Sequence, residues 1–387
     1  MPIRNRFAEL LPEIKEWRQH LHRNPEILYE VHRTAAFVAG KLRAFGVDEV
    51  VEGIGRTGVV GVIRGKGAGT KTIGLRADMD ALPIHEDTGL DYASEVPGKM
   101  HACGHDGHTS MLLGAAKYLA ETRNFDGNVV LIFQPAEEGG AGAKAMVDDG
   151  LIDRFGIDEV YGMHNAPGVP VGMIVTRPGP LQASADEFEI VVTGLGGHAA
   201  EPHKAVDTTL VASQIVVTLH SVVSRNVDPL HSVVLTVGTF QTDSNASNII
   251  PQTARMRGTV RCLNPDDREK MEARVRRVVE DTASAFGATA ELHWEYGYPV
   301  TVNDEDATGW AVEAARAVAI DVDDAANPIM PSEDFSYMLN ERPGAYLFLG
   351  NGDSAMCHHP KYNFNDEAIP YGCSFFAEIV ERRMPAR

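Results

Sequence analysis

The chain has 387 residues, which is long for one hydrophobic core and predicts two domains or one domain with a large insertion. Hydrophobic residues at 44% and charged residues at 23% are typical of a folded globular protein and exclude a disordered one. The formal net charge of -19 disfavours nucleic acid and anionic membranes as partners, and residues 1–21 lack the apolar core of a signal peptide. No apolar run approaches the length of a membrane span, and four cysteines are too few for a disulfide scaffold. We therefore expect a cytoplasmic protein that acts on a small molecule.

The first third of the chain predicts helices followed by strands. Apolar residues recur at helical spacing over residues 11–45, and the Asn-Pro-Glu break at 24–26 divides them into two helices. Two β-branched runs, residues 59–63 and 72–75, are separated by a glycine-containing turn and predict a hairpin or adjacent strands. A helix follows over residues 109–122.

Polar residues follow several of the predicted strands. Residues 129–133, 159–163 and 345–349 are apolar runs of the kind found in buried strands, and a helix is predicted over residues 143–149. Alternating strands and helices predict an α/β sheet, where ligands gather beyond the carboxyl ends of the strands. The polar residues at those ends are Asp78, Asp80, Glu137, Glu138, His164 and His358.

The pattern changes between residues 183 and 296. Strands are predicted over residues 186–192, 232–240, 253–262 and 289–294, and helices over residues 205–223 and 266–286. This β-α-β-β-α-β order is typical of a ferredoxin-like domain. Because strands with candidate ligands lie on both sides of it, we predict a catalytic domain of residues 1–182 and 297–387 with residues 183–296 inserted. The last part of the chain predicts helices over residues 306–318, 334–339 and 369–382.

Residues 100–108, Met-His-Ala-Cys-Gly-His-Asp-Gly-His, combine a thiol, three imidazoles and a carboxylate. Such groups are costly to bury unpaired, so we interpret the segment as a metal-binding loop. Cys103 and His105 can converge on one ion because Gly104 relaxes the backbone between them. Thiolate and imidazole favour zinc or a similar first-row metal. The alternative is a surface loop whose histidines are solvated.

Glu138, His164 and His358 bring the candidate ligands to five. That is more than one tetrahedral site with an open position requires, so we predict two divalent ions, with zinc, manganese, cobalt or nickel all possible. Of the adjacent Glu137 and Glu138, one can hold metal while the other acts as general base toward water whose pKa the metal lowers to about 7. Asp80 is predicted to orient a ligand or tune the base. The alternatives are a hydrogen-bonded core histidine at 164 and two solvated surface acids.

The middle domain carries candidates of its own. His198 lies in a glycine-rich turn, and Asn248 precedes the strand that contains Arg261. His198 could donate a hydrogen bond to a developing oxyanion, and Arg261 could bind a substrate carboxylate in bidentate fashion. An ordinary turn histidine and a solvated strand arginine are equally compatible with the local sequence.

Six segments together resemble the M20 family of two-metal metallopeptidases, most closely its aminoacylase, hippurate hydrolase and indole-acetyl-amino-acid hydrolase branch. They are Leu-Arg-Ala-Asp-Met-Asp-Ala-Leu-Pro (75–83), Met-His-Ala-Cys-Gly-His-Asp-Gly-His (100–108), Phe-Gln-Pro-Ala-Glu-Glu-Gly (133–139), Gly-Leu-Gly-Gly-His-Ala-Ala-Glu-Pro-His (194–203), Ser-Glu-Asp-Phe (332–335) and His-His-Pro-Lys-Tyr-Asn-Phe-Asn-Asp (358–366). The resemblance implies a two-domain α/β protein, with a mixed-sheet, zinc-peptidase-like catalytic domain and an inserted ferredoxin-like α+β lid that mediates dimerisation.

The resemblance also implies site residues and a quaternary structure. The implied ligands are Cys103, His105, Glu138, His164 and His358, with His359 as the fallback for His358. Glu137 is implied as the base. His198 is implied to reach the partner subunit's active site, with Asn248 and Arg261 near the substrate carboxylate, in a homodimer or a dimer-based tetramer.

Two departures from the broader family favour the aminoacylase-like branch. Asp78-Met79-Asp80 stands where many of its peptidases have a His-x-Asp pair, and Cys103 stands where they use an aspartate. The leading hypothesis is therefore a metal-dependent amidohydrolase that cleaves N-acyl or N-aroyl amino acids. The alternatives are a dipeptidase or carboxypeptidase acting on small peptides, a cysteine amidase using Cys103 with His105 or His108, and a metal- or peptide-binding protein without turnover.

Overall fold

A computed structural model describes residues 5–386, which form two compact units. Among the described residues, unit 1 comprises residues 5–181, 302–327 and 334–386, and unit 2 comprises Gln182–Thr301 and Pro328–Glu333. The short segment Pro328–Glu333 belongs to unit 2 because Ala183 donates backbone hydrogen bonds to the carbonyls of Ile329 and Pro331. The predicted insertion of residues 183–296 did not include this segment.

Unit 1 is built on a mixed sheet, which within residues 5–386 has eight strands. In spatial order they are β1 (Glu49–Ile54), β2 (Gly58–Arg64), β4 (Asn128–Gln134), β3 (Thr72–Asp78), β5 (Glu159–Pro167), β16 (Gly344–Gly352), β6 (Met173–Val175) and β15 (Asp321–Asp323). The central strands β4, β3, β5 and β16 are parallel, whereas β1, β2 and β4 pair antiparallel. The predicted α/β fold class with a mixed sheet is thus confirmed.

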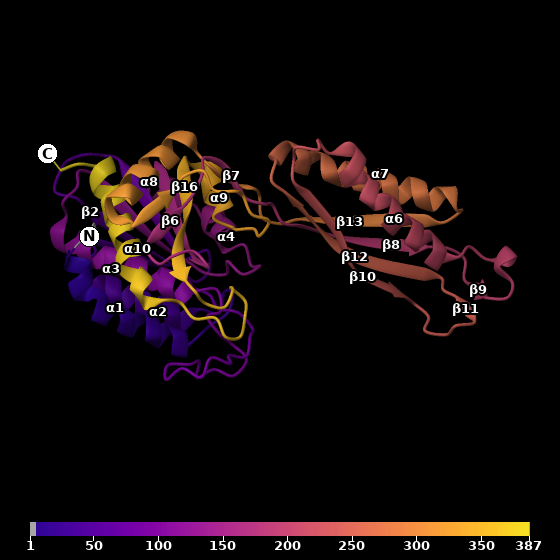
Figure 1. Ribbon diagram of the computed structural model, residues 1–387, viewed down its shortest axis with the longest axis horizontal. Helices are drawn as coiled ribbons and strands as arrows, with labels where there is room; N and C mark the ends of the chain where they lie inside the picture. Colours follow the sequence, from indigo (N-terminus) through magenta and orange to yellow (C-terminus); the bar gives the residue numbers. More distant parts are fainter. Residues whose placement is uncertain (1–4, 387) are drawn as a thin grey trace. The chain divides into compact units, whose positions relative to one another are not determined.

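Helices cover both faces of this sheet (Figure 1). They are α1 (Asn5–Arg23), α2 (His32–Ala44), α3 (His105–Thr122), α8 (Glu305–Val318) and α10 (Ile369–Arg383) on one face, and α4 (Gly142–Asp148), α5 (Leu151–Arg154) and α9 (Ser336–Glu341) on the other. Successive residues of β4 point to opposite faces, so Val129 and Leu131 pack in one hydrophobic cluster and Val130 and Ile132 in the other. Residues 129–133 are continuously apolar because both faces of β4 are buried, as this run predicted.

The prediction that residues 59–63 and 72–75 form a hairpin or adjacent strands was wrong. These runs are β2 and β3, and β4 lies between them. After β2 the chain turns toward the segment that precedes β4: Gly65 donates to the carbonyl of Gly127, and Lys66 donates to that of Phe125. A Cβ on Gly65 would lie 2.0 Å from the Phe125 carbonyl oxygen, so this crossing requires glycine. Glycines that suggested a hairpin turn instead allow a close backbone crossing.

Two further boundaries differ from the prediction in ways that matter for the site. The prediction ended the strand before His164, but His164 lies within β5. It pairs with Phe348 of β16, and the two strands stay paired beyond this point. Helix α3 begins at His105 and not at residue 109. Gly104 has a φ of 95° and accepts backbone hydrogen bonds from Gly107 and His108, which starts the helix inside the Cys/His segment.

Unit 2 has the predicted β-α-β-β-α-β order. Its elements are β8 (Asp186–Thr193), α6 (Thr208–Asn226), β10 (Val233–Thr242), β12 (Thr253–Cys262), α7 (Pro265–Ala285) and β13 (Thr289–Tyr296). The strand order is β10-β12-β8-β13, all antiparallel, and both helices pack on one hydrophobic cluster with the sheet. Its smaller elements are β9 (Gly197–His198), β11 (Ile249–Ile250) and the 3₁₀ turn η1 (Pro202–Lys204). The 3₁₀ turn η2 (Asp366–Ala368) belongs to unit 1, and the short strands β7 (Gly179–Gln182) and β14 (Thr301–Asn303) pair with each other.

A buried carboxylate anchors the start of β5, the strand that carries His164. Glu159 is 5% exposed and forms ion pairs with Lys71 and Arg383, while Tyr161 Oη donates to it at 3.0 Å. Burial would raise the pKa of Glu159, but its bonds to Arg383 and Lys71 hold that pKa below its usual value. The carboxylate therefore stabilises the fold in its ionised form.

We expect Glu159→Gln to lower the free energy of unfolding by about 1–3 kcal/mol at pH 7, because it removes a charged partner of two basic groups. The folded pKa lies below the unfolded value, so the contribution is present above the unfolded pKa and is lost as the pH falls through the folded pKa. Urea unfolding at pH 7 and pH 4 checks this result. A difference between wild type and variant that grows toward acid pH would contradict it.

Within residues 5–386, no helix is both long and apolar enough to span a membrane.

Candidate metal centre and active site

The Cys/His loop is held in an unusual conformation that only glycine tolerates at its centre. A Cβ on Gly104 would lie 2.4 Å from Asn165 Nδ2 and 2.5 Å from Tyr362 Oη. Those two side chains are hydrogen-bonded to each other, and Asn165 also donates to the Cys103 carbonyl at 2.6 Å. The turn thereby directs Cys103 and His105 toward the same region, as the spacing across Gly104 predicted.

His105 is fully buried, and among the described residues neither of its ring nitrogens has a hydrogen-bond partner. Carboxylates approach both nitrogens at longer range: Asp80 lies 3.5 Å from Nδ1, and Glu138 and Glu137 lie 3.9 and 4.0 Å from Nε2. A buried imidazole without hydrogen bonds is costly, whereas a ligand to an ion is satisfied. Its surroundings therefore fit a cation.

The electrostatics of the cluster point the same way. Burial alone would lower the pKa of His105, but the negative charge of Asp78, the close approach of Asp80 to Nδ1 and the charges of Asp80 and Glu138 raise it to about 10. Burial would raise the pKa of Glu138, yet the hydrogen bond from His358 and the charge of His105 lower it. The buried carboxylates thus hold an excess of negative charge that a divalent cation would neutralise.

All five predicted ligands converge in unit 1. Cys103 Sγ lies 3.3 Å from His164 Nε2, and His358 Nε2 lies 3.3 Å from Glu138 Oε1. Cys103 belongs to two sets of donor atoms that lie within 4.8 Å of one another, one with His105 and His164 and the other with Glu138 and His358. This arrangement suits a thiolate shared by two ions, and the individual roles stay predictions.

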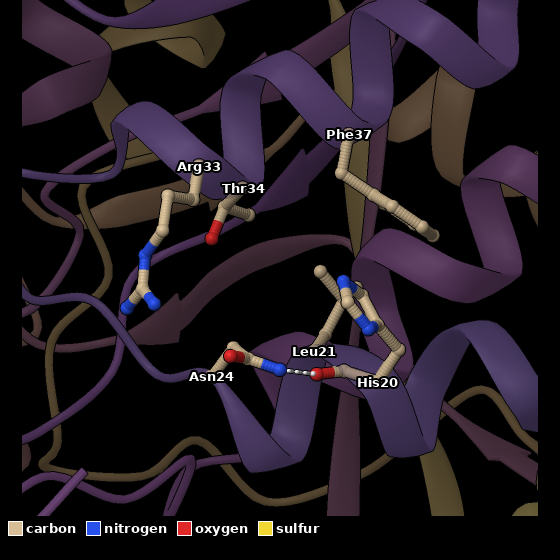
Figure 2. Close-up of a pocket in the computed structure, with 6 residues that line it drawn as sticks. All are labelled: His20, Leu21, Asn24, Arg33, Thr34 and Phe37. Carbon is tan, nitrogen blue, oxygen red and sulfur yellow. Dashed lines mark hydrogen bonds between the residues drawn. The ribbon is translucent and has the colours of Figure 1, made fainter. Parts of the chain in front are cut away.

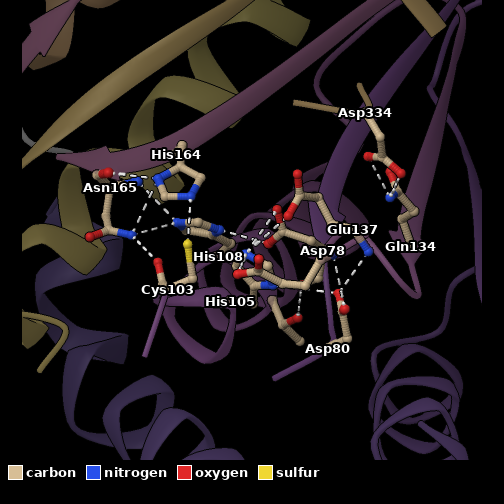
Figure 3. Close-up of polar contacts among 12 residues, drawn as sticks. Asp78, Asp80, Cys103, His105, His108, Gln134, Glu137, His164, Asn165 and Asp334 are labelled. Carbon is tan, nitrogen blue, oxygen red and sulfur yellow. Dashed lines mark hydrogen bonds and ion pairs between the residues drawn. The ribbon is translucent and has the colours of Figure 1, made fainter. Parts of the chain in front are cut away.

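Asp80 holds the turn that carries the two adjacent glutamates (Figure 3). Its Oδ1 accepts the backbone N–H of Glu137 at 2.9 Å, and its Oδ2 accepts that of Glu138 at 3.2 Å. Ala136 has a positive φ of 53°, which turns the chain sharply before the pair. Asp80 thus contacts His105 and both glutamates, and its orienting role stays a prediction.

His108 is committed to the protein framework. Its Nε2 accepts the backbone N–H of Asn165 at 2.9 Å, so Nδ1 carries the proton and donates to Asp78 Oδ1 at 2.7 Å. Asp78 is also bonded to Arg76 Nη1 at 2.7 Å. Although Asp78, His105 and His108 lie close enough to hold an ion, these bonds leave His108 no nitrogen for one.

The two neighbouring histidines of the last loop face different partners. His358 points to Glu138, and its backbone N–H donates to the Ala102 carbonyl at 2.8 Å, which ties this loop to the Cys/His segment. The ring of His359 accepts the backbone N–H of Lys361 at 3.1 Å. The geometry therefore favours His358 over His359 as the donor.

In unit 2 the structure brings His198 and Asn248 together. Strands β9 and β11 pair His198 with Ile249, and Ala199 donates its backbone N–H to the Asn248 carbonyl at 3.0 Å. His198 Nδ1 accepts the backbone N–H of Ala200 at 3.1 Å, so its neutral ring carries the proton on Nε2 and offers a donor.

Arg261 lies elsewhere in unit 2. It is near the end of β12, whereas β11 precedes the start of that strand at Thr253. Eight residues of extended chain span roughly 25 Å. Arg261 donates to Ser332 Oγ at 3.3 Å and is not brought to Asn248 within one chain.

A separate hollow of about 100 Å³ lies at α1 and α2 (Figure 2). Its lining residues are His20, Leu21, Asn24, Arg33, Thr34 and Phe37. Asn24 Nδ2 donates to the His20 carbonyl within it. It shares no residue with the metal cluster, and we assign it no role in the chemistry.

Fold and site together define a metallohydrolase with a buried cluster of donors at the ends of parallel strands. Residues 74–382 match the family described as peptidase family M20/M25/M40. The chain belongs to this family, as its motifs predicted.

Three curated relatives cover most of the chain. It is 43% identical to a hippurate hydrolase from Campylobacter jejuni over 97% of each chain. It is 42% identical to an N-acetyl-L-cysteine deacetylase from Bacillus subtilis, over 94% of this chain and 86% of the relative. It is 40% identical to thermostable carboxypeptidase 2 from Saccharolobus solfataricus, over 94% of this chain and 93% of the relative.

Two solved structures resemble the whole chain. A putative aminohydrolase from methicillin-resistant Staphylococcus aureus matches with a TM-score of 0.92 and 34% identity over 98% of both chains. A dinuclear metal-binding peptidase of the M20 family from Bacillus subtilis matches with a TM-score of 0.86 and 33% identity, over 98% of this chain and 100% of that one.

Proposed function

We propose that this protein is a two-metal amidohydrolase that cleaves the amide bond of N-acyl or N-aroyl amino acids to a carboxylic acid and a free amino acid. The observation that carries the proposal is buried His105, without a hydrogen bond among the described residues and surrounded by the other donors. Relatives named as a hippurate hydrolase and an N-acetyl-L-cysteine deacetylase support this substrate class.

Cys103, His105, Glu138, His164 and His358 would hold the two ions. The thiolate and three imidazoles favour zinc or another first-row metal over magnesium. When bound, such ions supply Lewis acidity, which makes water more acidic and polarises a carbonyl group. The similarity to a dinuclear metal-binding peptidase supports two ions per chain.

The chain's own residues divide the remaining work. Glu137 is 7% exposed and lies beside His105, which suits it to take a proton from the attacking water and deliver it to the leaving nitrogen. His198 would donate its Nε2 proton to the oxygen that becomes negative during attack. Arg261, which Ser332 orients, would bind the free carboxylate of the substrate.

The separation inside unit 2 supports the predicted homodimer. His198 lies beyond the start of β12 and Arg261 near its end, roughly 25 Å away at the usual rise of a strand. A small N-acyl amino acid does not span that distance, so both residues can touch one substrate only when they come from two copies of the chain. The dimer, like the cytoplasmic location, stays a prediction.

We expect His198→Ala to lower kcat by about a hundredfold or more, the usual effect of losing one oxyanion donor. Mixed dimers of His198→Ala with a Glu137→Gln subunit should recover part of the activity, because one of their two sites then has both residues. Activity of the mixture, compared with each homodimer, checks this arrangement. No recovery in dimers shown to be mixed would contradict action across the interface.

Metal analysis of the purified protein and a hydrolysis panel test the proposal directly. The panel contains N-benzoyl, N-acetyl and indole-acetyl amino acids, each with several amino acids, together with dipeptides. We expect two ions per chain and chelator-reversible hydrolysis of the acylated compounds. Preferential cleavage of dipeptides would favour the carboxypeptidase alternative, to which the similarity with a thermostable carboxypeptidase lends weight.

A further inference from the structure

A second buried carboxylate, Asp334, contacts the loop that carries Glu137 and Glu138. This loop leaves β4 at Gln134 and enters α4 at Gly142. Asp334 is fully buried and comes from a segment 200 residues away from Gln134 in the sequence. It is not among the predicted site residues.

Asp334 is bonded at both ends of this loop. At the start, Gln134 Nε2 donates to its two oxygens at 2.8 and 2.9 Å. At the end, the backbone N–H of Ala143 donates to Oδ2 at 2.9 Å. Figure 3 shows the Gln134–Asp334 pair on one side of the cluster and Asp80 below Glu137, so separate carboxylates hold the ends and the middle of the loop.

A buried arginine, Arg76, links Asp334 to Asp78, which lies beside His105 in the donor cluster. Arg76 is 1% exposed and donates from Nη2 to Asp334 at 3.0 Å, from Nε to Gln134 Oε1 at 2.8 Å and from Nη1 to Asp78 at 2.7 Å. A buried guanidinium needs opposite charge on both sides, and Asp78 and Asp334 provide it. Loss of charge at Asp334 would therefore loosen the loop and unbalance Arg76.

We propose that Asp334 is a positioning residue, which fixes Glu137 and Glu138 by holding both ends of residues 134–143 and by neutralising Arg76. The inference rests on the proposed function for its catalytic consequence. Its structural part concerns the order of the loop and can be measured without any substrate.

The test compares Asp334→Asn with wild type and with Glu159→Gln, another buried carboxylate paired with basic side chains in unit 1. Hydrogen exchange of the backbone amides in residues 136–143 reports the order of the loop. For Asp334→Asn we expect exchange there to rise about tenfold or more, the factor that corresponds to a lost charge-assisted hydrogen bond, and kcat to fall with KM little changed. Glu159→Gln should leave the exchange of this loop and kcat unchanged.

The outcomes separate the two proposals. A folded Asp334→Asn variant with unchanged exchange in residues 136–143 would overturn the positioning role, whatever the activity. Faster exchange of the loop in a protein whose wild type does not hydrolyse N-acyl amino acids would uphold the positioning role and reject the proposed function. If Asp334→Asn does not fold, Gln134→Met decides: it removes the amide and keeps Asp334 and Arg76, and an unchanged loop would overturn the inference.

Discussion

Glu137→Gln is expected to lower kcat by about 10³-fold or more while both metal ions stay bound. A general base usually contributes about 10²–10⁴-fold, and a thousandfold loss corresponds to about 4 kcal/mol of transition-state stabilisation. The change preserves size and the backbone bond to Asp80 but removes the group that can accept a proton. Steady-state kinetics together with metal analysis of the same sample measure both quantities.

The adjacent glutamate supplies the matched control. Glu138 shares the turn and the same Asp80 anchor, but its carboxylate faces His358 at 3.3 Å. We expect Glu138→Gln to lose metal and activity together, whereas Glu137→Gln loses activity alone. Near-wild-type turnover by metal-loaded Glu137→Gln would remove Glu137 from the role of base.

Residues that lie at the end of an element could be predicted from the sequence because the pattern of the element places them. The apolar run of β4 announces a buried strand, and Glu137 and Glu138 follow it at the edge where parallel strands end. The same reasoning located Asp78 and Asp80. His164 was found for a related reason, although β5 continues past it.

Roles that depend on a distant partner could not be predicted this way. The spacing from Cys103 singled out His105, but the partners of His108 could not be predicted: the backbone N–H of Asn165 and the carboxylate of Asp78 occupy its two ring nitrogens. Neither ring nitrogen of His101 or His105 has a hydrogen-bond partner among the described residues, and only His105 has the other candidate ligands around it. The partners of His108 belong to other strands. The order of β2, β4 and β3 is likewise a matter of long-range pairing.

Asp334 shows what a motif can and cannot indicate. It lies in the Ser-Glu-Asp-Phe segment (332–335) that contributed to the family resemblance, but the resemblance gave it no role. Only the fold shows that it meets Gln134, Ala143 and Arg76. Two features together would have indicated a role for Asp334. It is a buried aspartate next to the short helix α9, and strand β3 contains a buried arginine, Arg76, whose partner was unexplained.

Cys103→Ala is expected to reduce the metal content more than the loss of any one histidine ligand. Cys103 is the donor shared by the set with His105 and His164 and by the set with Glu138 and His358. Removing a residue that only hydrogen-bonds a metal ligand lowers metal affinity roughly 10–100-fold. Removing a thiolate that both ions share should therefore lower the metal affinity by more than about a hundredfold. His164→Ala and His358→Ala each remove a donor from one set, and we expect each to lose one ion in preference to the other.

Cys357→Ala is the matched control, because this second thiol lies 3.9 Å from the Cys103 carbonyl oxygen and is outside both sets of donors. It should keep both ions. The comparison also separates the metal hypothesis from a cysteine amidase, for which Cys103→Ala would abolish turnover while wild type worked without metal and resisted chelators. Thiolate and imidazole bind metal only when deprotonated, so wild type should lose its ions as the pH falls. If Cys103→Ala keeps two ions at wild-type affinity, the shared thiolate is ruled out.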